Sequence, residues 1–476
     1  MQGISNTVTV LEQCGVTPAP DAVPVTSLPL RFFDLMWLTF HPLGRVIFYD
    51  FPYSTDHFTQ HTVPNLKTSL SLALKHFTPL AGKLLTPSDA NSNADYEIQF
   101  VDGDSVSVTF AECTGDLNHL LGNHVRDANM LERLVVQLPS TTCTNSSGEN
   151  CSVSPVFAIQ VTVFPNSAIC IGITNSHVVA DGSTMYNFVR AWASIAKQVN
   201  ISHGELDVND VVSSGEFQIP NYDRSSIKDP YGLGTMILEV AGPMMKQILQ
   251  QREIIQASSS AKVRATFVLT EANIRALKNT VLTKRPNLTY VSSFTSMCAY
   301  LWTCFAKSRA TVYKEAHNLD EPQNFGFVMD CRDRLDPPLP ASYFGNCLVP
   351  CIGVQTGRVM VGDEGLAAAA EVLGNAISLK LKKGPLHGSD KWMEDFAGVM
   401  RGEWHMGIAG SPKLDYYNNI DFGCGKPLKF EFVNEPLSLS RCKDSKMDIE
   451  VGVILPKNEM NVFSAVFTKG LDCLDG

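Results

Sequence analysis

The architecture of this chain follows from residues 171–183, which read Ile171-Gly172-Ile173-Thr174-Asn175-Ser176-His177-Val178-Val179-Ala180-Asp181-Gly182-Ser183. Residues 168–173 form an apolar run rich in β-branched side chains, which predicts a buried strand. From Met185 onward the apolar residues follow helical spacing, which predicts a helix. His177 therefore falls where a buried strand ends and a glycine-containing turn begins, and scaffolds commonly present a reactive side chain to a cleft at such a place.

Acid–base chemistry is the function that this turn suggests. Histidine has the side-chain pKa nearest neutral pH, so His177 can act as a base without extreme tuning. Asp181 follows four residues later, and it could orient His177 or turn away and brace the loop through a salt bridge. On this motif alone, a structural histidine at the edge of the core stays open as the alternative.

The segment from His177 to Gly182 resembles the H-x-x-x-D-G motif of the plant BAHD acyl-CoA-dependent acyltransferases. Chloramphenicol acetyltransferase and the condensation domains of peptide synthetases carry related motifs. In those families the histidine is the general base and the aspartate is largely structural, so the resemblance implies these roles for His177 and Asp181.

Three further segments extend the resemblance over essentially the whole chain. Residues 28–37 are similar to the N-terminal signature of the clade that acts on anthocyanins and other phenolic glycosides, and residues 343–347 match the Y-F-G-N-C motif of that clade. Residues 421–425 correspond to the family's D-F-G-W-G, except that Cys424 replaces the tryptophan. The loss of a large ring predicts a pocket that is wider or differently filled.

The resemblance assigns roles to several of these residues. It implies that the motif of residues 421–425 mainly supports the structure and shapes the channel. The supporting residues are Asp421, Gly423, Cys424, Gly425 and Arg332, and the substrate-channel residues are Tyr343 and Asn346. Asp421 is expected to brace its loop, and the glycines are expected to permit tight backbone geometry.

Arg332 lies in the stretch Asp330-Cys331-Arg332-Asp333-Arg334, which matches a D-x-R-x-R stretch of the family. We hypothesise that Arg332 pairs with Asp181 across the interface between two domains. A solvated run of charges is the alternative.

The function implied by the resemblance is acyl transfer from coenzyme A to a sugar hydroxyl of a flavonoid, anthocyanin or other phenolic glycoside, with no acyl-enzyme. Acyl-CoA is then a co-substrate, and neither a permanently bound cofactor nor a metal is expected. The candidate residues for binding coenzyme A are Lys262, Arg264, Lys307 and Arg309, for which ordinary surface charges are the alternative.

The acyl donor remains open between malonyl and hydroxycinnamoyl groups. A malonyl carboxylate needs a basic partner in the acyl pocket, whereas an aromatic acyl group needs a wide apolar one. Residues 188–192 read more like the malonyltransferases, which favours malonyl slightly. An N-acyltransferase of the same fold and a non-catalytic binding homologue are the rival functions, and the intact His177 motif argues against the second.

The 476 residues exceed one ordinary core, and strand and helix patterns are mixed in both halves. These patterns predict an α+β fold, and the resemblance implies two similar domains like chloramphenicol acetyltransferase with a solvent channel between them. Residues 1–200 form the first domain, 201–230 a crossover linker and 231–476 the second domain. Neither half carries a nucleotide-binding glycine motif in a suitable context.

Composition narrows the remaining classes of protein. Hydrophobic residues at 44% and charged residues at 18% are typical of a globular protein, and no apolar run reaches membrane-spanning length. The net charge of −10 argues against nucleic acid as a partner. We expect a cytoplasmic protein, because the first residues lack a signal peptide. We also expect a monomer. The 13 cysteines are scattered without C-x-x-C pairs, which predicts reduced and mostly buried thiols.

Three local patterns predict further elements. Residues 157–163 are expected to pair with the strand that delivers His177. Residues 96–101 and 106–110 alternate like the two strands of a hairpin, with a turn at 102–104. The polar residues 141–152 predict an exposed loop.

Overall fold

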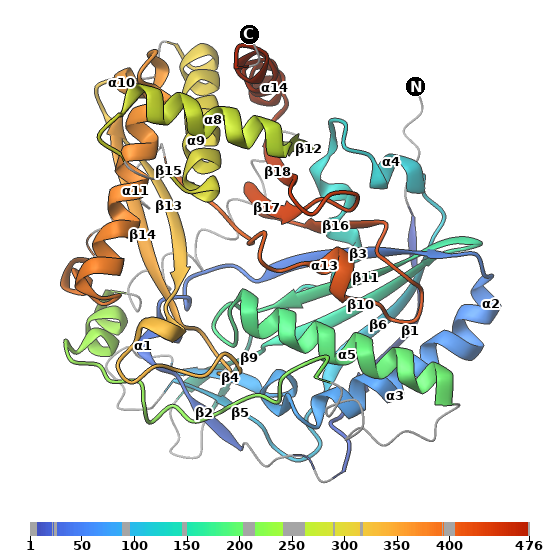
Figure 1. Ribbon diagram of the computed structural model, residues 1–476. Helices are drawn as coiled ribbons and strands as arrows, with labels where there is room; N and C mark the ends of the chain where they lie inside the picture. The colour runs from blue at the N-terminus through green and yellow to red at the C-terminus, as the bar shows by residue number, and fades with distance from the viewer. Residues whose placement is uncertain are drawn as a thin grey trace.

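The computed structural model mixes helices with several sheets, as the sequence predicts (Figure 1). It describes residues 7–20, 22, 26–87, 96–144, 150–202, 215–240, 262–288, 291–314, 318–392, 394 and 405–474. The remaining residues lie outside this description, and they include residues 203–214 of the predicted linker.

A six-stranded sheet carries the histidine motif. In spatial order its strands are β1 (Val8–Val16), β6 (Val106–Cys113), β10 (Phe157–Phe164), β11 (Ser167–Asn175), β3 (Leu43–Phe51) and β16 (Lys429–Phe432). The antiparallel partners of β11 are β10 on one side and β3 on the other, which confirms the pairing predicted for residues 157–163. Every residue of β11 except Ser167 is buried, because helices and loops cover both faces of this strand. The backbone that leads to His177 is therefore fixed on both sides.

Two helical segments pack side by side against one face of this sheet (Figure 1). The first is continuous and consists of α2 (Thr55–His57), the π-helical segment η1 (Phe58–Thr62) and α3 (Val63–Leu74). The second is α5 (Gly182–Ser202), the helix predicted from Met185. Trp192 of α5 donates a hydrogen bond from Nε1 to Ser69 Oγ of α3 at 3.1 Å.

The second half builds two sheets and has its own apolar core. Most of its helices lie at the upper left of Figure 1. The strands of one sheet are, in order, β17 (Leu437–Arg441), β18 (Ile449–Pro456), β12 (Lys262–Leu269) and β7 (Arg126–Asp127). The strands of the other sheet are β14 (Leu348–Thr356), β13 (Pro322–Asp330) and β15 (His405–Gly407). The helices are α8 (Glu271–Lys284), α9 (Ser293–Val312), α10 (Gly357–Val361), α11 (Gly365–Lys383) and α14 (Lys457–Asp472). Thr270 caps α8 by accepting from Asn273 N, because its side chain satisfies one of the amides that a helix start leaves free.

The two halves exchange strands. β16 comes from the second half but closes the edge of the first sheet beside β3. In return, β7 comes from the first half and pairs with β12. The division at residues 201–230 therefore stays a prediction about domains, and two sheets of the structure cross it.

One predicted hairpin is wrong. Residues 102–104 do turn, with Asp104 N donating to Val101 O at 2.9 Å, but the strands on either side join different sheets. β6 belongs to the six-stranded sheet. The earlier strand belongs to a five-stranded sheet of β2 (Ser27–Pro29), β5 (Glu97–Gln99), β4 (Lys83–Pro87), β9 (Asn150–Pro155) and β8 (Thr141–Thr144). Alternation in sequence fixes the strands and not their partners.

The loop predicted at 141–152 is also wrong where the structure describes it, because β8 and β9 pair there as antiparallel strands. Cys151 is disulfide-bonded, in contrast to the reduced state predicted for the cysteines. In the β8–β9 register its backbone lies opposite that of residue Cys143.

The short elements are α1 (Phe32–Leu35), α4 (Leu117–Leu121), α13 (Tyr416–Asn419) and the 3₁₀ turns Thr78–Ala81, Ala128–Met130, Glu132–Leu134, Arg332–Arg334 and Ser389–Lys391. Among the helices of the described ranges, none has both the length and the apolar character needed to cross a membrane.

Candidate active site

His177 lies two residues beyond the end of β11, in the turn that leads into α5, as the sequence predicts. The side chain is buried, with 8% of its surface exposed. The indole of Trp37 stacks on the imidazole, with ring centres 3.6 Å apart and planes 11° apart. Phe40 packs edge-on against the same ring at 6.2 Å. The imidazole is thus held flat between fixed neighbours.

Asn346 determines which nitrogen of His177 carries the proton. Its Oδ1 lies 3.1 Å from His177 Nδ1. Its Nδ2 lies 2.9 Å from His177 O, 3.1 Å from Val178 O and 3.1 Å from Asp34 Oδ1, all of which only accept. The amide orientation is therefore fixed, and Oδ1 must accept from Nδ1–H. Nε2 is left with its lone pair, which is the form that a base requires.

Asp34 anchors this arrangement from the N-terminal segment. Its Oδ1 accepts from Asn346 N at 3.0 Å, and Arg224 forms an ion pair with its Oδ2. Arg31 N donates to Oδ2 at 3.0 Å, so both carboxylate oxygens are engaged. Sequence reasoning did not single out Asp34 as a functional residue. The available signal was one carboxylate inside the apolar signature of residues 28–37.

The environment of His177 favours its neutral form. The pKa of His177 is lowered to about 4, mainly by burial and to a smaller extent by the positive charge of Arg45. The carboxylate of Glu435 and the hydrogen bond with Asn346 act in the opposite direction. Burial dominates because the imidazolium form loses its hydration inside the protein.

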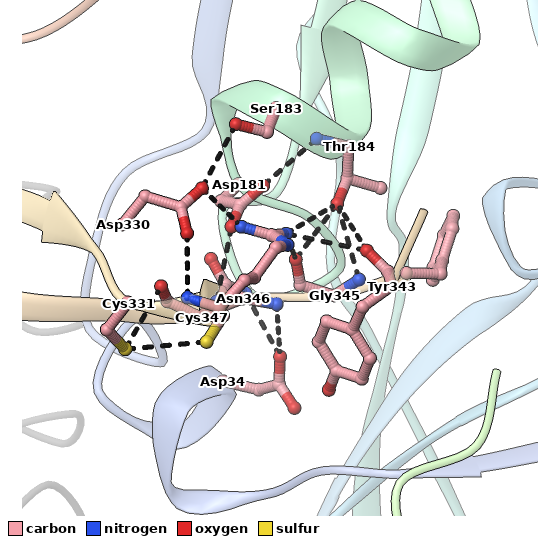
Figure 2. A network of polar contacts seen from close by, with 12 residues as sticks. Asp34, Asp181, Ser183, Thr184, Asp330, Cys331, Tyr343, Gly345, Asn346 and Cys347 are labelled. Atoms are coloured by element: carbon pink, nitrogen blue, oxygen red, sulfur yellow. Dashed lines mark hydrogen bonds and ion pairs between the residues drawn. The ribbon is translucent and has the colours of Figure 1, made fainter. Parts of the chain in front are cut away.

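Asp181 braces the loop and does not orient the imidazole. Its Oδ2 accepts from Cys347 N at 3.2 Å and pairs with Arg332 Nη2 at 2.8 Å, so the predicted ion pair with Arg332 is confirmed. Its Oδ1 accepts from Thr184 N at 3.0 Å, which caps the first turn of α5. Figure 2 shows Asp181 and Thr184 at this end of α5, facing Asn346 and Cys347 of the second half.

Arg332 contacts both halves, since besides its pair with Asp181 its Nη2 lies 3.3 Å from Thr184 Oγ1 of α5. Its Nη1 pairs with Asp330 Oδ2 at 2.7 Å, and its Nη2 lies 3.2 Å from Gly345 O. Burial alone would lower the pKa of Arg332, but the carboxylates of Asp181 and Asp330 raise it above its usual value. Arg332 is therefore a buried, fully charged bridge, and the solvated run of charges is excluded.

Two residues of the Y-F-G-N-C motif pack beside this bridge. The guanidinium carbons of Arg224 and Arg332 lie 5.8 and 5.7 Å from the centre of the Tyr343 ring. Tyr343 is 1% exposed, so these contacts place it in the supporting network and not in the predicted channel. Gly345 has φ +130°, and a Cβ there would lie 2.7 Å from Arg224 Nη2, which explains the need for glycine.

The D-F-G-C-G loop packs on the first half, although it was predicted to belong to the second domain. Asp421 Oδ1 accepts from Gly423 N at 2.9 Å and Gly425 N at 2.8 Å, which confirms that it braces the loop. Its Oδ2 pairs with Lys197 of α5 at 2.8 Å. Both glycines have positive φ, +91° and +82°.

Cys424 borders a cavity of about 270 Å³ that Ile169 and Ile171 of β11 also line. Asn175, the last residue of β11, lies four positions after Ile171, which is about 13 Å along the strand. The space beside Cys424 therefore lies along β11, away from His177. Burial raises the pKa of the Cys424 thiol to about 11.

The four residues predicted to bind coenzyme A do not form one group. Arg264 is wrong for this role, because it is buried and pairs with Glu431 Oε2 at 2.6 Å. Arg309 of α9 pairs with Glu459 Oε1 at 3.0 Å. Lys262 is exposed and faces Pro456 in the β12–β18 register, near the start of α14, and Lys307 is half-buried on α9. In the described ranges, no group of three or more His, Cys, Asp and Glu side chains could hold a metal ion.

Comparison with known proteins agrees with this geometry. The model of the Transferase family matches residues 6–469. The chain is 41% identical over 485 residues to a malonyl-coenzyme A:anthocyanin 3-O-glucoside-6''-O-malonyltransferase of Dahlia pinnata, with 99% of both chains covered. It is 41% identical over 473 residues to phenolic glucoside malonyltransferase 1 of Nicotiana tabacum, with 98% of this chain and 99% of the other covered.

Two further proteins bear on the acyl donor and on the fold. The chain is 33% identical over 477 residues to coumaroyl-CoA:anthocyanidin 3-O-glucoside-6''-O-coumaroyltransferase 1 of Arabidopsis thaliana, with 97% of both covered. The crystal structure of Vinorine Synthase aligns with a TM-score of 0.65 over 96% of both chains at 17% identity, a likeness that concerns the fold.

Replacing Arg332 with Ala should lower the free energy of unfolding by about 3–5 kcal/mol, because a buried carboxylate loses its partner. Urea unfolding measures this change, and amide hydrogen exchange over residues 177–184 should show a loosened turn. The matched control is Arg334→Ala, since Arg334 and its partner Asp333 are 38% and 73% exposed. An equal change in both variants would contradict the bracing role.

The imidazole of His177 should titrate near pH 4 instead of near its ordinary value of 6.5. It should therefore be neutral throughout the physiological range and gain its proton only as the pH falls through that value. Carbon-13 NMR of labelled histidines measures the midpoint, and comparison with the His177→Gln variant identifies the signal. A midpoint between 6 and 7 would show that burial does not control this group.

Proposed function

The chain belongs to the Transferase family, the BAHD acyltransferases that use acyl-CoA as co-substrate, and we propose that it transfers a malonyl group to a sugar hydroxyl of a phenolic glycoside. The acceptor is a flavonoid, anthocyanin or other phenolic glucoside. The observation that carries the proposal is His177, neutral and held with a free Nε2 lone pair at the end of a rigid strand. The names of the two relatives at 41% identity support the acceptor class and the malonyl donor.

The reaction begins when His177 Nε2 takes the proton of the acceptor hydroxyl. The acceptor oxygen attacks the thioester carbonyl, and a tetrahedral intermediate forms. The intermediate collapses to the ester as the carbon–sulfur bond breaks, and protonated His177 returns its proton to the departing sulfur. No acyl-enzyme forms, so no cysteine is needed as a nucleophile.

Asn346 acts as a positioning residue in this scheme. A base with a low pKa is weak, and its protonated form must be stabilised as the hydroxyl ionises. Asn346 Oδ1 accepts from Nδ1–H throughout, so it stabilises the imidazolium where it forms. Holding both substrates in line with Nε2 supplies a further part of the acceleration.

The proposal of a malonyl donor is supported by the names of the relatives. Residues 188–192, which favoured malonyl in the sequence, do not support it in the structure. Phe188, Val189 and Trp192 of that segment are buried in the first core at 0–1% exposure. They support α5 against the sheet and cannot line an acyl pocket. A hydroxycinnamoyl donor, as in the coumaroyltransferase relative, is the alternative.

We also propose that the enzyme is a cytoplasmic monomer. Free thiols at buried positions such as Cys113, Cys170 and Cys298 suit a reducing compartment, whereas the bonded Cys151 is the exception. Size-exclusion chromatography with light scattering would give the oligomeric state directly.

Replacing Asn346 with Leu should lower kcat by about 10–100-fold, because a buried N–H without its acceptor costs about 1–3 kcal/mol. The KM for acyl-CoA should stay within about twofold, because Asn346 is assigned to the imidazole and not to the substrate. Asn65→Leu on α3, which also removes a half-buried amide, is the control and should leave both constants near wild type. A rise in KM with unchanged kcat would refute the positioning role.

The proposed function predicts acceptor-dependent release of free thiol from malonyl-CoA, faster than from p-coumaroyl-CoA, and its loss in His177→Ala. The assay uses a panel of flavonoid and anthocyanin glucosides, with the corresponding aglycones as matched acceptors without sugar. Amine acceptors in the same panel test for an N-acyltransferase. Thiol release with only aglycones or only amines as acceptors would refute the proposed sugar hydroxyl. No release with any combination of donor and acceptor would point to a binding protein.

A further inference from the structure

Most buried arginines in the described structure form ion pairs with carboxylates, but one of them, Arg45, does not. The part of the chain that the structure describes contains five buried arginines. Four of these form ion pairs, namely Arg126 and Arg264 with Glu431, Arg224 with Asp34, and Arg332 with Asp181 and Asp330. Arg45 is 3% exposed, and no carboxylate of the described residues lies within ion-pair distance of it.

Arg45 lies on β3 directly opposite Ile173 of β11. Its Nη1 donates to Asn175 Oδ1 at 2.5 Å, so the guanidinium reaches along β11 toward the turn of His177. Its Nε finds no acceptor among the described residues. The guanidinium carbon lies 5.5 Å from the centre of the Phe432 ring, which covers its flat face.

The nearby carboxylate of Glu435 does not neutralise this charge. Its Oε1 is bound to His41 Nε2 at 2.9 Å, and no ion pair joins it to Arg45 in the described structure. Arg45 is nevertheless close enough to the active site for its charge to lower the pKa of His177. A cation held in a dry interior without a counter-ion is costly, and an anionic ligand would remove that cost.

We propose that Arg45 forms the carboxylate subsite of the acyl pocket and selects thioesters of a short dicarboxylic acid. This inference rests on the proposed acyl transfer at His177. The guanidinium is a planar fork that matches a carboxylate with two hydrogen bonds. In a malonyl thioester the carboxylate carbon is two bonds from the reacting carbonyl, so its cation must lie near the base. Arg45 meets this requirement through its hydrogen bond to Asn175, two residues before His177. This is the basic partner that a malonyl donor requires and that sequence reasoning did not find.

The test compares malonyl-CoA with acetyl-CoA, which differ by the carboxylate alone. Wild type should prefer malonyl-CoA in kcat/KM, and Arg45→Gln should lower this preference by about 30-fold or more, since a charged hydrogen-bonded pair is lost. Arg45→Lys should retain an intermediate preference, because the charge stays and the fork is lost. Arg190→Gln on α5 is the matched control and should keep the wild-type preference.

A second measurement covers the case in which a variant folds poorly or no acyl transfer is found. Malonate should raise the melting temperature of wild type more than acetate does, and Arg45→Lys should reduce that difference. The inference would be overturned if the malonyl preference survived in Arg45→Gln, if kcat/KM fell by the same factor with both donors, or if the preference was lost in Arg190→Gln. Failure of acyl transfer with every donor would instead refute the proposed function, while the malonate effect would still decide the role of Arg45.

Discussion

One side-chain amide, that of Asn346, joins three segments that are far apart in the sequence. It contacts Asp34 of the N-terminal signature, the backbone of the His177 turn and the imidazole itself. Each contact restricts the others, because an amide that donates on one side can only accept on the other. The tautomer of His177 is thus a consequence of how the two halves of the chain meet, and displacement of either half would release it.

Buried ion pairs hold these halves in register. The pair between Asp181 and Arg332 fixes the turn after β11, and the pair between Asp34 and Arg224 fixes the N-terminal segment behind Asn346. Such pairs add little net stability compared with apolar packing, but each is strongly unfavourable when broken. Their contribution is to make one docking arrangement far better than its neighbours. The exchanged strands β16 and β7 act in the same direction, since each half completes a sheet of the other.

The positive charge of Arg45 near His177 has a role separate from these ion pairs. The desolvated interior that keeps His177 neutral also makes Arg45 an electrostatic feature that the substrate must match. His177, Asn346 and Arg45 therefore gather near the end of β11, and no carboxylate of the described residues forms an ion pair with Arg45. The D-F-G-C-G loop lies along the same strand but away from this end, where Asp421 ties it to α5. Cys424, where the loop departs from the family pattern, borders a cavity that is not lined by His177.

The sequence by itself determined the features that depend on neighbours along the chain. The β-branched run, the glycine turn and the helical spacing after Met185 were sufficient to place His177 at a strand end, because period and turn chemistry are local. Motif order identified the family, and the D-x-R-x-R stretch was sufficient to suggest the Arg332 partner of Asp181. Only the tertiary structure decided which strands pair, and the predicted hairpin of residues 96–110 was wrong for that reason. It also decided that Asp34 supports Asn346, that Arg264 pairs with Glu431 and that no carboxylate of the described residues pairs with Arg45. These outcomes depend on contacts between residues that are distant along the chain, which local patterns do not contain.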